Sequence, residues 1–243
     1  MSTSTEPFVV KTPTELNEQP AEYQDLVKKI IISHAINELT GAILFDEPAI
    51  ALAPTPYWKW LTCRVAMEEY GHHVRFSKMG QQIGVPEERM VPGEAAKKAL
   101  SIFDFKPSTW VEFGVIKMLG DLAEILQVED LLTCSYVPLQ AAARETMPEE
   151  KFHSTFGTKS CTEIAQTPEG RAELQDAIDR LFPTFPAFFG RPNSKNNALY
   201  RKWGIKVHTN EALRADYMER CRVLVEDKLS LKLPHVELSS AER

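Results

Sequence analysis

Apolar residues recur every three or four positions over most of the chain, and no convincing run of alternating apolar and polar residues interrupts them. This period is typical of amphipathic α-helices, whereas half-buried strands alternate every second residue. Prolines and small polar residues separate the periodic segments and indicate where helices begin and end. The sequence therefore predicts an all-α protein.

The predicted helices differ in length and are divided mainly at prolines. Glu47-Pro48 should loosen or end the first, because the residue before a proline disfavours helical geometry. Pro138 should kink or divide the fourth segment, and Thr146-Met147-Pro148 should open the next one. A loop is expected over 190–197. The expected helices cover residues 20–46, 56–84, 93–103, 109–145, a segment from 146 onward, 167–189 and 209–233.

Chain length and composition fit one helical domain, which we expect over 20–234, with tails at 1–19 and 235–243. The 243-residue chain has 43% hydrophobic and 26% charged residues, a composition typical of globular proteins. The net charge of −6 repels the negative phosphate backbone of nucleic acids, so a nucleic-acid partner is not expected.

No stretch approaches the ~20 apolar residues of a membrane span, and the start has no basic region followed by an apolar one. We therefore expect a cytoplasmic protein. The cysteines Cys63, Cys134, Cys161 and Cys221 stand far apart. Their spacing excludes the usual thiolate zinc and redox motifs and favours reduced structural thiols.

Acidic side chains interrupt the apolar stripes of several predicted helices. In the second helix the stripe Trp58, Leu61, Val65 is followed by Glu69 and His72 before it resumes at Phe76. Glu38 and Asp121 occupy the same kind of position in the first helix and in the helix from 109. A buried unpaired carboxylate costs several kcal/mol or becomes protonated. A cation at these positions is therefore expected.

Two Glu-x-x-His motifs lie on these stripes, Glu69-Tyr-Gly-His72 and Glu150-Lys-Phe-His153. Residues three apart share a helix face, so each motif presents a carboxylate and an imidazole to one point. Four carboxylates offset the charge of two divalent ions, and oxygen with imidazole ligation suits Fe, with Mn as the other choice. The sequence thus predicts a di-metal site formed by Glu38, Glu69, His72, Asp121, Glu150 and His153.

The spacing of the carboxylates predicts how the helices pair. Glu38 and Glu69 are 31 residues apart, and Asp121 and Glu150 are 29 apart. Each interval corresponds to half a helix, a turn and half an antiparallel helix. Two such hairpins form a four-helix bundle in which two helices give one carboxylate each and two give Glu-x-x-His.

Other interpretations of these residues stay open. The acids and histidines of the two motifs could instead cap helices, form ion pairs at the surface, or be core polar groups whose hydrogen bonds are satisfied. Glu124 competes with Asp121, but its own stripe, which includes Lys117, is polar and is expected to be solvated. Glu68 and His73 point away from the motif and are expected in an outer shell or at the surface. His34 is expected to be a hydrogen-bonded core or rim histidine.

In these residues the chain resembles the catalytic subunits of bacterial phenylacetyl-CoA epoxidases, which are ferritin-like di-iron monooxygenases. The likeness covers roughly residues 25–234, and an aspartate at the third ligand position is a fairly specific mark of the group. It rests on the order of the six candidate ligands and on Trp110-Val-Glu-Phe-Gly-Val-Ile, Ser135-Tyr136, Phe189-Gly190, Trp203-Gly-Ile-Lys206 and Leu231-Lys-Leu-Pro234. The chain departs from the group in its short C-terminal extension and in Glu124.

The resemblance implies a ferritin-like bundle with additional C-terminal helices and an oxygen-dependent monooxygenase active in phenylacetate catabolism. The six residues would hold or bridge two irons, with the carboxylates Glu38, Glu69, Asp121 and Glu150 taking part in catalysis. The implied substrates are O2 and an aryl-acyl-CoA such as phenylacetyl-CoA, whose ring becomes an epoxide. The implied partners are a reductase that passes electrons from NADPH and a structural sister subunit, in an oligomeric complex.

Two other functions remain open. A non-catalytic scaffold subunit would share the fold and pair its core polar groups internally. A ferritin-type metal oxidase would oxidise Fe(II) without an organic substrate. Metal content separates the first alternative from the di-iron enzyme, and substrate dependence of O2 uptake separates the second.

Overall fold

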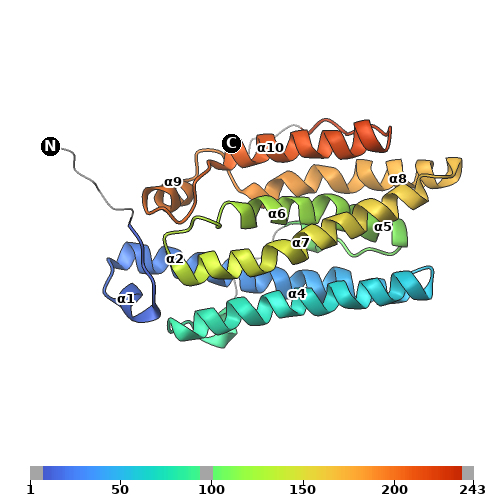
Figure 1. Cartoon of the computed structure of the whole chain (residues 1–243). Helices are drawn as coiled ribbons and strands as arrows, with labels where there is room; N and C mark the ends of the chain where they lie inside the picture. The colour runs from blue at the N-terminus through green and yellow to red at the C-terminus, as the bar shows by residue number, and fades with distance from the viewer. Residues whose placement is uncertain (1–7, 94–100, 237–243) are drawn as a thin grey trace.

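The structure, a computed structural model, describes residues 8–93 and 101–236, and in this part of the chain four long helical segments lie side by side as a bundle (Figure 1). Within it α2 packs on α4, and α5–α6 pack on α7. This arrangement confirms the all-α, ferritin-like fold. The four segments are α2 (Ala21–Gly41) with the π-helix η1 (Ala42–Asp46) and α3 (Glu47–Leu52); α4 (Pro56–Gln82); α5 (Trp110–Val115) with the π-helix η4 (Ile116–Gly120) and α6 (Asp121–Glu129); and α7 (Val137–Ile164).

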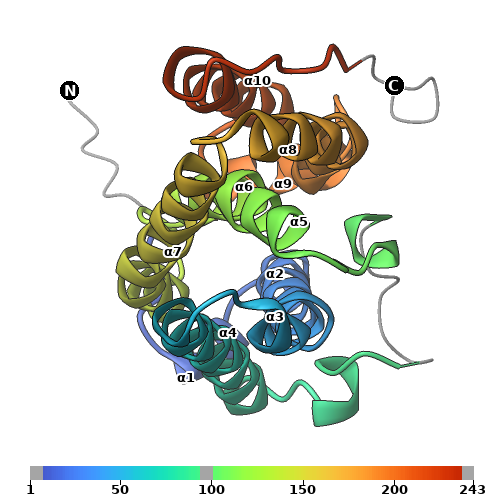
Figure 2. The same ribbon diagram turned by 90° about the vertical axis from the view of Figure 1, so that its right-hand side faces the viewer.

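The C-terminal part covers one side of the bundle. Figure 2, which looks along the bundle, shows α8 and α10 beyond α5 and α6, and the contacts of α8 with α5 and of α10 with α6 agree. These elements are α8 (Pro168–Leu181), the 3₁₀ segment η5 (Phe182–Phe189), α9 (Lys195–Lys202), α10 (Asn210–Arg222) and the π-helix η6 (Val223–Lys228). This layer does not cover the sides of α2, α4 and α7 that face away from α8 and α10 (Figure 2).

Shorter elements complete the described chain. The stretch at 8–19, which we expected to belong to a tail, contains α1 (Pro13–Asn17) and places Val10 and Leu16 in the core. The remaining short elements are the 3₁₀ turns η2 (Glu87–Arg89) and η3 (Ser101–Asp104). Most of the helix expected over 93–103 lies outside the described residues. No described helix is long and apolar enough to cross a membrane.

Of the three proline-based boundaries, the one at Pro148 is wrong, whereas a loosened π-helical turn does precede Pro48 and the segment over 109–145 is divided a few residues before Pro138. The first helix continues past Pro48 to Leu52, because the π-helical turn η1 shifts the hydrogen-bond register just before the proline that lacks a donor. Pro138 lies in the first turn of α7, where a missing N–H costs nothing. Pro148 lies inside α7 and does not open a helix. Packing of α7 on α4, α5 and α6 on both sides of Pro148 outweighs its cost of about 3 kcal/mol.

The break that divides the segment over 109–145 lies instead after Glu129. The buried Asp130 accepts hydrogen bonds from the backbone N–H groups of Val207 (3.1 Å) and His208 (3.0 Å). These long-range bonds, which no local pattern predicts, fix the chain where α6 ends. Two further differences lie near the C-terminus. The helix α9 begins inside the loop expected over 190–197, and the last helix ends at Lys228 rather than near 233.

The hydrophobic core has two parts that meet at a polar layer. One cluster contains Phe45, Val65 and Phe156, and the other contains Phe76 and Met147. Along α4 the chain passes from the first cluster to the second between Val65 and Phe76, and along α7 it passes back between Met147 and Phe156. The predicted site residues of both helices lie in these intervals, so the fold places a polar layer across the middle of the bundle.

Gly157 lets α7 approach the π-helix η4 closely. A Cβ atom there would lie 2.2 Å from the Met118 backbone nitrogen and 2.5 Å from the Lys117 carbonyl carbon. We expect Gly157→Ala to lower the free energy of unfolding by about 3 kcal/mol, because backbone cannot move aside as a flexible side chain can. Gly71→Ala, which meets nothing within 4 Å, should be neutral or stabilising by about 0.5–1 kcal/mol. Urea denaturation of both variants tests this, and equal effects would contradict it.

Candidate metal centre

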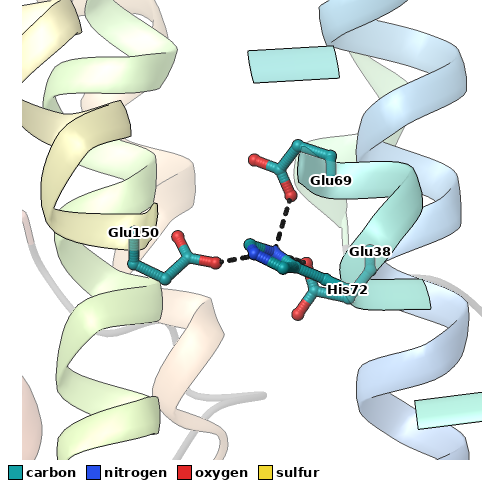
Figure 3. A group of neighbouring side chains, drawn as sticks. All are labelled: Glu38, Glu69, His72 and Glu150. Atoms are coloured by element: carbon teal, nitrogen blue, oxygen red, sulfur yellow. Dashed lines mark ion pairs between the residues drawn. The ribbon is translucent and has the colours of Figure 1, made fainter. Parts of the chain in front are cut away.

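Six buried side chains converge between the four helices. Each is at most 9% exposed, and each was singled out from the sequence. Figure 3 shows four of them, with the His72 ring between Glu150 on one side and Glu38 and Glu69 on the other. The six come from α2 (Glu38), α4 (Glu69 and His72), the first residue of α6 (Asp121) and α7 (Glu150 and His153).

The convergence has two halves, each centred on an imidazole. His72 Nδ1 lies 3.1 Å from Glu150 Oε1, and 3.5 Å from both Glu38 Oε2 and Glu69 Oε2. One ligand atom from each of these four residues falls within 4.8 Å of the others. This half of the site could hold one metal ion by three carboxylates and one imidazole.

The second half repeats the arrangement around His153. Its Nδ1 lies 3.1 Å from Glu69 Oε1 and 3.8 Å from Glu150 Oε2. With Asp121 these residues form a second group of four within the same 4.8 Å limit. Glu69 and Glu150 belong to both groups, so each carboxylate faces both imidazoles, as ligands that bridge two ions would.

Outer carboxylates orient both imidazoles. His72 Nε2 lies 2.9 Å from Glu149 Oε2, and His153 Nε2 lies 2.9 Å from Glu68 Oε2. A carboxylate only accepts hydrogen bonds, so each Nε2 carries the hydrogen and each Nδ1 can turn a lone pair inward. The pairing is reciprocal, because each histidine is held by the acid that precedes the other motif. Both motifs are therefore Glu-Glu-x-x-His, at Glu68–His72 and Glu149–His153.

The outer pairs yield a prediction about affinity. We expect Glu68→Gln and Glu149→Gln each to weaken divalent-metal binding about 10–100-fold, because a glutamine amide no longer fixes the ring as a carboxylate does. Isothermal titration with Mn²⁺ measures the change. Glu163→Gln, which alters an acid of α7 that bonds Trp58 instead, is the control. Unchanged affinity in both outer variants would contradict the assigned role.

Lys117 is a buried cation within the site, and the expectation that its stripe is solvated is wrong. It is 2% exposed, and its Nζ lies 2.7 Å from Glu69, 2.8 Å from Asp121 and 3.2 Å from Asp46. Both Lys117 and Asp46 lie in π-helical turns, η4 and η1. Lys117 lies four residues before Asp121, a spacing that places both on one helix face, so its assignment to the solvated stripe of Glu124 was the error.

Burial and nearby charges raise the pKa of some side chains in the cluster and lower the pKa of others. Burial raises the pKa of Glu150 to about 7 and that of Asp121 well above its usual range. The pKa of Glu69 lies well below its usual range, although burial opposes its ionisation, because Lys117 and His153 face it. Glu69 and Glu68 raise the pKa of His153 to about 10 against the effect of burial. Protons thus balance the charge here without a metal, and a metal ion would have to displace them.

The donor atoms fit a pair of metal ions. Glu150 Oε1, His72 Nδ1 and His153 Nδ1 are buried and make no hydrogen bond of acceptable geometry within the described chain. Such atoms are rare in folded proteins unless an ion or water satisfies them. Carboxylate oxygens with imidazole nitrogens are ligands of Fe and Mn. The cluster could therefore bind metal.

A small cavity of about 50 Å³ adjoins the cluster. On the side away from the ligands its wall is largely apolar and includes Phe45, Phe103, Phe185 and Phe188. Such an apolar wall offers water few hydrogen-bond partners on that side. The segment that provides Phe185 and Phe188, η5, belongs to the C-terminal layer and contacts α6.

The other candidates fall outside the two groups of four. Glu124 and His34 lie beside Glu38 and form a cluster of their own. His73 is half-buried and faces α2, with its Nδ1 2.8 Å from the Ala35 carbonyl oxygen. Glu68, expected in an outer shell or at the surface, orients His153. Cys63 is exposed, the other three cysteines are buried, and all four are free.

Sequence reasoning missed three features of the site, namely Lys117, Asp46 and the role of Glu149. The doubled acids Glu68-Glu69 and Glu149-Glu150 were a usable signal, because the first acid of each pair lies at the same offset from its histidine. The spacing of four residues between Lys117 and Asp121 was also a usable signal, whereas no comparable signal marks Asp46.

Comparison with known proteins agrees with this geometry. The family model described as phenylacetic acid catabolic protein matches residues 10–243. The chain belongs to this family. It is also 31% identical over 226 residues to one of the subunits of the 1,2-phenylacetyl-CoA epoxidase of Escherichia coli (strain K12), a match that covers 90% of this chain and 72% of that protein. The relative is thus part of an epoxidase, and the resemblance inferred from the sequence is confirmed.

Proposed function

We propose that this chain is the oxygen-activating subunit of a di-iron monooxygenase that epoxidises the aromatic ring of an aryl-acyl-CoA such as phenylacetyl-CoA. The observation that carries the proposal is the pair of four-residue groups that share Glu69 and Glu150. The similarity to part of a phenylacetyl-CoA epoxidase supports the choice of reaction and substrate. One oxygen atom of O2 enters the ring, and the other is reduced to water by two electrons and two protons.

The residues that would hold the irons follow from the two groups. Glu38 and His72 would bind one ion, Asp121 and His153 the other, and Glu69 and Glu150 both. When bound, the irons supply the reduction and activation of O2. The protein supplies the positions: Glu68 and Glu149 keep both imidazole lone pairs directed inward, and the bundle keeps the four carboxylates from spreading apart.

The apolar wall beside the cluster would contact the aromatic ring after its side chains move apart, because the cavity of about 50 Å³ is smaller than the ~150 Å³ of a cavity that binds benzene. Phe45, Phe103 and Phe188 line it and would help to keep bulk water from the site during the reaction. Electrons would come from NADPH through a separate reductase. A structural sister subunit would complete the enzyme, since the relative's name describes it as one subunit of an epoxidase.

Reconstitution tests this function. The purified chain, loaded anaerobically with Fe(II) and combined with its sister subunit, reductase and NADPH, should consume O2 only when phenylacetyl-CoA is present and should release the epoxide. Mass spectrometry with ¹⁸O2 should find one labelled atom in the product. Rapid O2 uptake with Fe(II) alone would favour a metal oxidase, and less than one metal per chain after loading would favour a scaffold. Either result would overturn the proposal.

A further inference from the structure

A second polar cluster lies beside the candidate metal centre, on the side facing α6. His34 Nδ1 is 3.2 Å from Glu124 Oε1 and 3.8 Å from Glu38 Oε1. One ligand atom from each residue falls within 4.8 Å of the others. Stacking on Phe76, with ring centroids 4.8 Å apart, fixes the His34 ring. Neither group of four at the centre includes His34 or Glu124.

Two carboxylate oxygen atoms in this cluster face His34 Nδ1 but make no hydrogen bond of acceptable geometry in the described chain. Glu38 directs Oε2 to His72, at 3.5 Å, whereas its Oε1 is buried without a hydrogen-bond partner in the described chain. The Glu38 side chain is only 5% exposed, so water cannot freely satisfy that atom. Glu124 Oε1 is in the same condition. An unsatisfied carboxylate oxygen costs free energy comparable to a lost charged hydrogen bond, which a bound cation would recover.

The cluster lies where an outer cleft meets the inner cavity. Glu38 and Glu124 line the cavity beside the candidate metal centre. His34 and Glu124 line a larger cleft of about 520 Å³ that also contains Lys29, Arg89 and Lys206. Glu124 therefore contacts both spaces. An ion held here would keep open coordination positions toward the cleft, which water or an incoming ligand could fill.

We propose that His34, Glu38 and Glu124 form a third divalent-cation site, distinct from the central pair, that binds Fe²⁺ or Mn²⁺ through two carboxylates and one imidazole. The donor set matches these ions rather than a thiolate-binding one. With three protein ligands and access to the cleft, the site should bind more weakly than the enclosed central positions. The inference shares Glu38 with the proposed function and rests on it to that extent.

Mn²⁺ alone is the probe. Crystals of the full chain, soaked in MnCl₂ and measured at the manganese absorption edge, should show anomalous density at the His34–Glu38–Glu124 cluster in addition to two central peaks. Equilibrium dialysis should count three Mn²⁺ per chain in the wild type and two in Glu124→Gln. Glu129→Gln, which removes an acid of the same helix that pairs with Arg220, should keep three.

The outcomes separate the two proposals. Density at the central pair alone, with two ions in both wild type and Glu124→Gln, overturns the third site and leaves the di-metal function intact. His34 would then serve as an imidazolium paired with Glu124. Absence of Mn²⁺ from both clusters overturns both proposals. Loss of all bound metal in Glu124→Gln also contradicts the third site, because it would mean that Glu124 belongs to the central pair.

Discussion

Replacing Glu150 with glutamine should reduce bound Mn²⁺ at the centre from two ions per chain to less than one. Glu150 is 1% exposed and faces both imidazoles, His72 at 3.1 Å and His153 at 3.8 Å. The amide keeps the size of the side chain but removes a negative charge from both positions and directs N–H donors where metal would bind. Equilibrium dialysis followed by elemental analysis measures the loss.

The fold of this variant should persist. Burial already raises the pKa of Glu150 to about 7 in the absence of metal, so a neutral glutamine resembles the protonated side chain. Thermal unfolding in EDTA should therefore match the wild type. Glu145→Gln, an exposed acid on the same helix, should retain full metal content. A Glu150→Gln protein that still binds two ions would show that Glu150 does not bridge them.

Replacing Lys117 with methionine should have opposite effects on the metal-free and the metal-loaded protein. Its ammonium compensates Asp46, Glu69 and Asp121 at distances of 3.2 Å or less. Removing one partner of a buried charge cluster typically costs about 3–5 kcal/mol, so stability in EDTA should fall by that amount. Affinity for Mn²⁺ should rise, because the metal no longer competes with an internal cation for Glu69 and Asp121.

The control for Lys117→Met is Lys151→Met, which removes an exposed lysine from the second motif. It should change neither stability nor affinity. The measurements are unfolding temperature with EDTA and with excess Mn²⁺, since a ligand stabilises the state that binds it. The gap between the two temperatures should widen in Lys117→Met. An unchanged or narrower gap would mean that Lys117 is a structural lysine that does not compete with metal.

The hydrophobic period predicted the long helices because it depends only on which residues face the core. The helix α4 has nearly the bounds that its hydrophobic period predicts. Thr55 caps its start by accepting a hydrogen bond from the Trp58 N–H, and Pro56 occupies its first turn. The convergence of the six site residues was equally predictable, because polar residues within apolar stripes must meet at one level once the helices pair. Their role as metal ligands remains a proposal.

The features that escaped prediction arise from contacts between distant segments. Asp130 ends α6 by bonding the backbone near His208, and Pro148 stays inside α7 because packing outweighs its local preference. Lys117 is buried by its ion pairs with Asp46 and Glu69 of other helices, beside the close approach that Gly157 permits. Local sequence patterns carry no information about such contacts, so the polar lining of the site was predicted only in part.

Anomalous diffraction from crystals loaded with Fe(II) under anaerobic conditions would decide whether the buried cluster is a di-iron centre. We expect two iron peaks about 3.5–4 Å apart, one beside His72 Nδ1 and one beside His153 Nδ1, with Glu69 and Glu150 contacting both. A single peak, or irons bound only at surface carboxylates while the six buried side chains keep their internal ion pairs, would contradict it.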